Sequence, residues 1–141
     1  MRRGILFAVV FIATACGSSK HGKPPNATRP PAPKPSFHVV IDAPTHRPPV
    51  NVKWWYTVHV SDSSGMGLRA RLTMQVIDPL GTSHPVQFGP TTRNIVNWPI
   101  RGSYRDYATW PRASRGYRLT MRATVKAKGA TQTASYAVVP R

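Results

Sequence analysis

The sequence predicts an all-β domain, built as an antiparallel two-sheet sandwich of about seven strands. Three segments alternate between apolar and polar residues, and no long segment carries apolar residues at helical spacing. An alternation with a period of two places one set of side chains on one face of a half-buried strand. Turn signals separate these segments at intervals of roughly 8 to 12 residues, the spacing typical of a sandwich.

Three long strands are predicted at residues 52–60, 68–77 and 117–125. Their inward-facing residues are Val52, Trp54, Tyr56, Val58 and Val60 in the first, Leu68, Ala70, Leu72, Met74 and Val76 in the second, and Tyr117, Leu119, Met121, Ala123 and Val125 in the third. The chain has one cysteine, so no disulfide can join the two sheets within it. We therefore expect packing of these apolar rows to hold the sandwich together.

Shorter segments complete the predicted sandwich. Strands are expected at 37–42, 85–88, 93–97 and 131–139, with turns at 61–67, 78–81 and 128–129, where Gly, Asp, Ser and Pro gather. Residues 98–117 are expected to form a long crossover that covers the open end of the sandwich. In that arrangement Asp106 would pair with a neighbouring arginine, and the crossover could still present its other arginines.

The first 15 residues have the pattern of a secretory signal peptide. A basic start is followed by the apolar run ILFAVVFIA and by small residues before Cys16. The apolar run is shorter than the roughly 20 residues that span a bilayer. Residues 16–36 contain six of the chain's prolines and no aromatic residue, so they are predicted to form a disordered, Pro- and Lys-rich tether.

Cys16-Gly17-Ser18-Ser19 resembles the start of many bacterial lipoproteins. That resemblance implies lipidation of Cys16 and an extracytoplasmic protein anchored to the membrane by its lipid. Ala13 stands where the family more often has Leu. Ala13-x-Ala15 also fits ordinary signal-peptidase cleavage, which would give a secreted protein instead.

Two stretches of the predicted domain resemble bacterial immunoglobulin-like domains, including fibronectin-like ones. One is YTVHVSDSSGMGLRARLTMQVID and the other is SRGYRLTMRATVKAKGATQTASYAV. Asp62, Gly65 and Leu68 match the first element of such domains, although Gly67 stands where proline is usual. Gly116, Tyr117, Leu119 and Thr120 match the second element. The resemblance covers about residues 49–141 and implies that the predicted domain, 37–141, has an immunoglobulin-like fold, with Tyr117 as a candidate for a tyrosine-corner hydrogen bond.

The composition argues against an enzyme. The chain has no Glu, and its acids are Asp42, Asp62, Asp78 and Asp106. Few carboxylates are therefore present to form a catalytic acid–base pair. Asp62 and Asp78 fall in turns, where bonds to the backbone explain them. His59 and His84 accompany no nucleophile motif.

Metal and cofactor binding are not predicted either. No His-x-Met or paired-His spacing occurs in the sequence. Met74 and Met121 fall on the apolar registers, where methionine is a core filler.

Charge is the feature that points to a function. The chain has 20 Lys and Arg against 4 Asp, a formal net charge of +16. Such an excess creates a positive field that favours an anionic partner. The candidate anion-binding residues are Arg69, Arg71, Arg118, Arg122, Lys126, Arg101, Arg105, Arg112 and Arg115, and the candidate aromatic contacts are Trp98 and Trp110.

We therefore expect a non-catalytic binding module with a basic surface. Its expected ligand is an anionic envelope component, either acidic phospholipid or a wall polymer. The alternative is a protein-interaction module that docks a membrane or envelope protein through a sheet edge or the crossover. Export argues against a nucleic-acid partner.

Overall fold

The computed structural model describes residues 37–87 and 89–141, which form an all-β domain. Its strands are β1 (Phe37–Asp42), β2 (Lys53–Asp62), β3 (Arg69–Ile77), β4 (Ser83–Pro85), β5 (Trp98–Arg101), β6 (Ser103–Thr109), β7 (Leu119–Ala127) and β8 (Ala130–Val138), and η1 (Arg112–Ser114) is a single 3-10 turn. The predicted signal peptide, Cys16, the tether and Phe88 lie outside the described residues.

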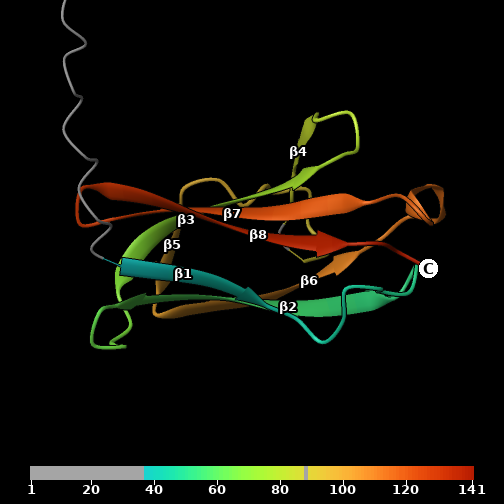
Figure 1. Ribbon diagram of the computed structural model, residues 1–141. Helices are drawn as coiled ribbons and strands as arrows, with labels where there is room; N and C mark the ends of the chain where they lie inside the picture. The colour runs from blue at the N-terminus through green and yellow to red at the C-terminus, as the bar shows by residue number, and fades with distance from the viewer. Residues whose placement is uncertain (1–36, 88) are drawn as a thin grey trace, which may run out of the picture. The chain divides into compact units, whose positions relative to one another are not determined.

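The strands form two antiparallel layers, as predicted (Figure 1). One layer has the order β1-β2-β6, and the other has the order β5-β3-β7-β8 with β4 paired to β3. Hydrogen bonding passes from one layer to the other at a corner where β5 and β6 share the single register pair Arg101↔Ser103. On the other side, the segment after β1 bonds to the chain end, with Val139 N–H donating to His46 O at 2.8 Å.

The core lies between the layers and is built from the predicted alternation. Trp54, Tyr56, Val58 and Val60 point inward from β2, and their alternation partners on the strand are less buried. Trp54 is the centre of an aromatic cluster. Its ring centroid lies 5.7 Å from that of Trp110 and 6.1 Å from that of Tyr56, and its indole N–H donates to Thr45 O at 3.2 Å.

The opposite layer supplies the other half of the core. Leu72 and Met74 of β3 and Met121 and Val125 of β7 are fully buried. The prediction that both methionines fill the core is confirmed. Apolar rows from two layers therefore replace the disulfide that the chain cannot form within itself.

Two predicted inward positions are wrong because they lie just outside their strands. Val52 precedes β2 and is half exposed. Tyr117 precedes β7, follows Gly116 with its φ of 78°, and is 57% exposed, so it makes no buried corner.

The region from 85 to 117 also differs from the prediction. Residues 93–97 are not a strand, because Asn97 has a φ of 50° and turns the chain into β5. The expected strand at 85–88 is replaced by the shorter β4. The expected crossover is in fact β5, β6 and η1. Sequence reasoning missed β6 because a buried Asp106 occupies an inward position and interrupts the apolar alternation.

Candidate functional site

A basic groove lies on the outer face of the second layer. The hydrogen-bond register puts Arg69 beside Arg101 and Arg71 beside Lys126, and Lys128 follows in the β7–β8 turn. These five exposed cations line an open depression of about 830 Å³ together with residues such as Pro99 and Thr131. Residues as far apart in sequence as Arg69 and Thr131 thus converge through strand pairing.

One arginine of the basic groove is held in position. The Arg71 guanidinium donates from Nη1 to Asn97 O at 3.2 Å. Asn97 is fixed in turn, because its N–H donates to the Thr73 hydroxyl at 3.2 Å. The left-handed turn at Asn97 therefore orients a cation as well as starting β5.

Among the described residues, no acidic side chain lines the basic groove. One groove cation, Lys128, influences Asp62 in the β2–β3 turn. The Ser64 hydroxyl chiefly lowers the pKa of Asp62, and the charge of Lys128 adds a smaller lowering. Asp62 is also occupied by the backbone N–H groups of Ser64 and Met66, both at 3.0 Å, as the turn prediction expected. The basic groove is thus left with uncompensated positive charge.

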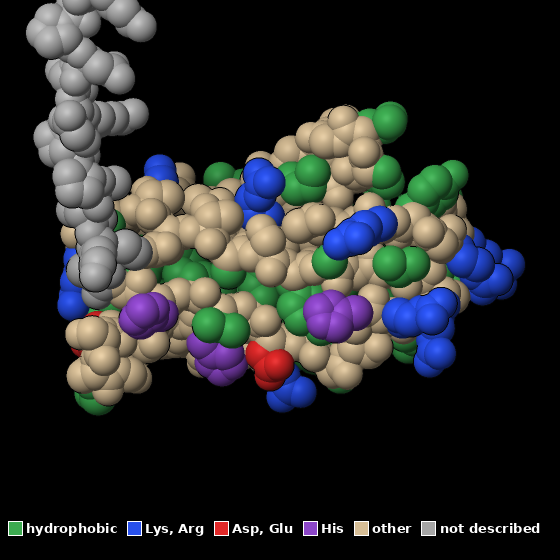
Figure 2. Space-filling model, viewed as in Figure 1, with side chains coloured by type: hydrophobic (Ala, Val, Ile, Leu, Met, Phe, Trp, Pro, Cys, Tyr) green, Lys and Arg blue, Asp and Glu red, His purple; other side chains and the backbone are tan. Residues whose placement is uncertain are grey.

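The other predicted cations do not join the basic groove. Arg122 lies on the same face of β7, opposite Gln75, and Arg118 lies beside His46 and Arg47 in a separate shallow pocket. Arg105 belongs to the other layer. Arg112 and Arg115 are exposed around η1. In Figure 2, basic side chains are spread over the visible face and acidic ones occupy little of it.

The two predicted aromatic contacts have different positions. Trp110 is only 4% exposed and packs against Trp54, so its ring belongs to the core of the sandwich. Trp98 is half-buried, with the Arg93 guanidinium carbon 4.7 Å above its ring.

Asp106 is buried, and it does not pair with an arginine as expected. The Tyr104 hydroxyl donates to its carboxylate at 2.9 Å, and the N–H groups of Gly89 and Tyr107 donate at 3.2 and 2.8 Å. Burial, followed by the Asp106 charge, raises the pKa of Tyr56, and burial with the Asp106 hydrogen bond raises that of Tyr104. This cluster stabilises the interior of the sandwich.

Sequence reasoning missed an aromatic and basic row on the outer face of the first layer. Trp55 of β2 is the register partner of Tyr107 of β6. Lys53 Nζ lies 4.7 Å from the Tyr107 ring centroid, and the Arg105 guanidinium carbon lies 5.0 Å from that of Trp55. The available signal was the position of Trp55 in the polar register of an alternating strand, between Lys53 and Thr57.

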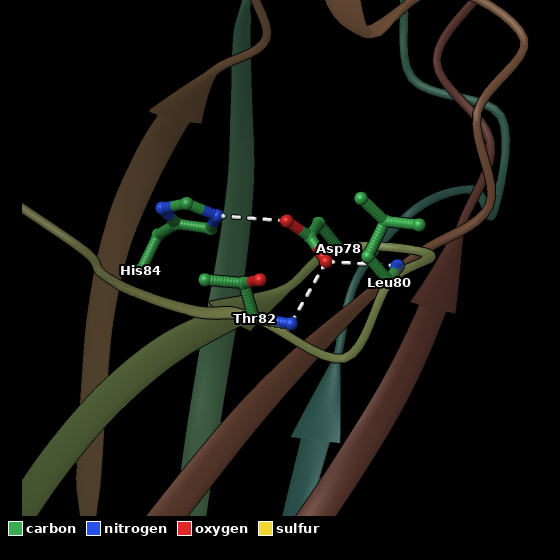
Figure 3. Close-up of polar contacts among 4 residues, drawn as sticks. All are labelled: Asp78, Leu80, Thr82 and His84. Atoms are coloured by element: carbon green, nitrogen blue, oxygen red, sulfur yellow. Dashed lines mark hydrogen bonds and ion pairs between the residues drawn. The ribbon is translucent and has the colours of Figure 1, made fainter.

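A second pocket, of about 810 Å³, is largely apolar. Val76, Leu80, Val86, Trp110 and Tyr117 are among its lining residues, and Leu80 is 92% exposed. At its rim Asp78 accepts hydrogen bonds from Leu80 N–H at 2.9 Å and Thr82 N–H at 2.8 Å, and it pairs with His84 at 3.1 Å (Figure 3). The predicted role of Asp78 as a turn residue is confirmed.

In residues 37–87 and 89–141, no group of three or more His, Cys, Asp or Glu is placed to hold a metal ion. Within the same ranges, no helix is long and apolar enough to cross a membrane.

Comparison with known proteins does not show a family for this chain. No protein-family model matches the chain, and no curated protein matches it. A crystal structure of a DUF4466 family protein from Parabacteroides merdae ATCC 43184 aligns with a TM-score of 0.44 and 14% sequence identity. The alignment covers 75% of this chain and 44% of that one, so the match spans less than half of the neighbour's length.

Proposed function

We propose that the protein is a non-catalytic, immunoglobulin-like binding module whose basic groove binds an anionic component of the cell envelope. The observation that carries this proposal is the convergence of Arg69, Arg71, Arg101, Lys126 and Lys128 in one depression, which no acid of residues 37–87 and 89–141 lines. Clustered charge of one sign raises the local concentration of an oppositely charged ligand. Arginine also matches phosphate and carboxylate oxygens with two parallel hydrogen bonds.

The strand arrangement supports the immunoglobulin-like part of the proposal. With the short β4 set aside, the first, second and fifth strands share one layer, and the third, sixth and seventh share the other. Immunoglobulin sandwiches divide their strands in the same way. The fourth strand, β5, shares only the corner pair Arg101↔Ser103 with β6 and pairs mainly with β3, which places Arg101 beside Arg69 and so contributes to the groove.

The location of the groove fits a membrane-anchored module. The described chain enters the domain at Phe37, whose register partner is Asp62, the acid that Lys128 influences. An anchor at Cys16 would therefore hold the domain by the end that carries the basic groove. If Cys16 is lipidated, Cys16→Ala should abolish labelling by a fatty-acid probe and release the protein from membranes. Normal labelling of the variant would reject the anchor.

Binding is tested with ligands that share phosphate chemistry. The probes are phosphatidylcholine vesicles with and without phosphatidylglycerol, and soluble poly(glycerol phosphate). We expect binding to the two anionic probes, with affinity that falls steeply as salt rises, because exposed charges are screened over about 8 to 10 Å at moderate ionic strength. Preference between vesicle and polymer distinguishes a lipid surface from a wall polymer.

Matched charge variants locate the site. Arg69→Gln with Lys126→Gln should weaken binding by about tenfold and flatten its salt dependence, since each removed cation removes one screened contact. Arg112→Gln with Arg115→Gln removes the same charge around η1 and should have a much smaller effect. Equal losses in the two variants would show diffuse attraction to the whole domain and would reject the groove as the site.

Protein docking is the second candidate, and the apolar pocket favours it. The exposed Leu80 and Tyr117 side chains are apolar surfaces of the kind that interfaces bury. The crossover that was one of the two expected docking surfaces is divided into strands, and Trp110 is buried, so the apolar pocket takes its place beside the sheet edge. Binding of an envelope protein that is insensitive to salt and to the groove variants, but is lost on Leu80→Asp, would favour this function.

A further inference from the structure

The outer face of the first layer carries a second, distinct surface, here called the aromatic row: Lys53, Trp55, Arg105 and Tyr107. All four side chains come from the paired strands β2 and β6. The basic groove lies on β3, β5, β7 and the β7–β8 turn, in the other layer. The outer faces of two stacked layers point away from each other, so one ligand contact cannot serve both.

Trp55 is poorly explained by packing. It is 45% exposed, although Tyr107 contacts it edge-on at 5.3 Å and Arg105 lies over its ring. Among the described residues its indole N–H has no hydrogen-bond partner. Trp54, the next residue, fills the core and uses its own N–H. Strand β2 thus has a tryptophan on each face. Trp54 is buried in the core, whereas Trp55 on the outer face stays exposed.

The charges around Trp55 define the chemistry of a ligand. The Cα atoms of Lys53 and Arg105 are offset by about 13 Å along the row, from four residues of strand at roughly 3.3 Å each. Their charged groups lean over the Tyr107 and Trp55 rings that lie between these Cα atoms. Asp42 reaches this face on β1, but the described residues place no carboxylate within 4.0 Å of either cation. A negatively charged group would therefore find donors at both ends of the row, with the Trp55 ring between them.

We propose that the aromatic row binds an anionic oligosaccharide. The apolar C–H face of a sugar ring can pack on the exposed indole, its hydroxyls can accept from the indole N–H, and its acidic substituents can pair with Lys53 and Arg105. A single-stranded nucleic acid fits less well, because successive bases stack on a series of aromatic side chains, and the aromatic row has one exposed ring, Trp55. Trp55 and Tyr107 are inclined at 60° to each other. This site extends the proposed function if the envelope polymer bound by the basic groove also contains sugars. If the basic groove binds no polymer, the proposal for the aromatic row is unaffected.

The experiment compares three polyanions on the full chain: polygalacturonate, which has acidic sugar rings, polyphosphate, which has no rings, and an oligo-dT strand. Trp55→Ala should weaken polygalacturonate binding by about three- to tenfold, the range of an aromatic contact. It should leave polyphosphate binding and the melting temperature nearly unchanged, because Trp55 is exposed. Trp55→Phe keeps a ring and should retain part of the affinity.

The groove variant Arg69→Gln with Lys126→Gln separates the two proposals. It should lower binding of all three polyanions, while the Trp55→Ala effect on polygalacturonate persists in its background. Three results overturn the saccharide site. They are equal loss of polyphosphate and polygalacturonate in Trp55→Ala, a selective loss of oligo-dT, and no loss of any ligand, which would make the row a structural cross-strand pair.

Discussion

The corner between the two layers leads to a sharp prediction about Gly67. A Cβ built on Gly67 would lie 2.7 Å from the Gly102 Cα. Carbon atoms pack at about 3.5 to 4.0 Å, so the methyl group added by Gly67→Ala would overlap the Gly102 backbone by about 1 Å. Gly102 cannot retreat freely, because its carbonyl accepts from Val60 N–H at 2.7 Å and its N–H donates to Leu68 O at 2.8 Å.

The expected size of the effect follows from these two terms. Overpacking typically costs about 1 to 3 kcal/mol. Lengthening one of the corner hydrogen bonds adds about 1 kcal/mol. We therefore expect Gly67→Ala to lower the free energy of unfolding by about 2 to 4 kcal/mol, a large fraction of the stability of a small domain.

Gly65 is a matched control two residues away. Its φ is +84°, but a Cβ there would meet nothing within 4 Å. Gly65→Ala should cost about 1 kcal/mol, from a left-handed backbone that is partly offset by the lower entropy of the unfolded chain. Urea unfolding followed by far-ultraviolet circular dichroism compares the two variants. A Gly67→Ala loss no larger than that of Gly65→Ala would refute the close approach at the corner.

Three further predictions test the core and the ionisable groups. Trp54→Ala should destabilise by about 3 to 5 kcal/mol in urea unfolding because the ring fills the core, and a loss below about 1 kcal/mol would contradict that burial. Hydrogen bonds in the folded state, chiefly from Ser64 to Asp62 and from His84 to Asp78, lower the pKa values of both carboxyl groups, so stability should be lost as pH falls below about 4. Carboxyl titration by NMR should give pKa values below 3.8 for Asp62 and Asp78. Burial raises the pKa of Tyr56 and Tyr104 above 10.0, so the stability of the fold should fall as pH rises past 10. Absorbance at 295 nm should show these two tyrosines ionising only when the protein unfolds. Ionisation of all five tyrosines before unfolding would argue against the burial of Tyr56 and Tyr104.

The residues of the long strands determined much of the architecture directly. Alternation in β2, β3 and β7 identifies which side chains face inward, because strand geometry sends neighbours to opposite faces. The Asp62 and Asp78 turns were equally readable, since a short carboxylate bonds the backbone a few residues onward. In β6 the inward-facing Asp106 interrupts the apolar alternation, and this strand was therefore not predicted from the sequence.

The tertiary structure alone decided which basic residues meet. Arg69 and Arg101 are 32 positions apart, and only the register of β3 with β5 makes them neighbours. Strand pairing also separates Arg105 from these two arginines, because the chain turns at Gly102 from β5 into β6, which belongs to the other layer. A sequence shows the charge of each strand face, but hydrogen bonding between distant strands determines which faces adjoin. The excess of positive charge was therefore visible in the sequence, whereas the basic groove and the row around Trp55 arise from strand pairing.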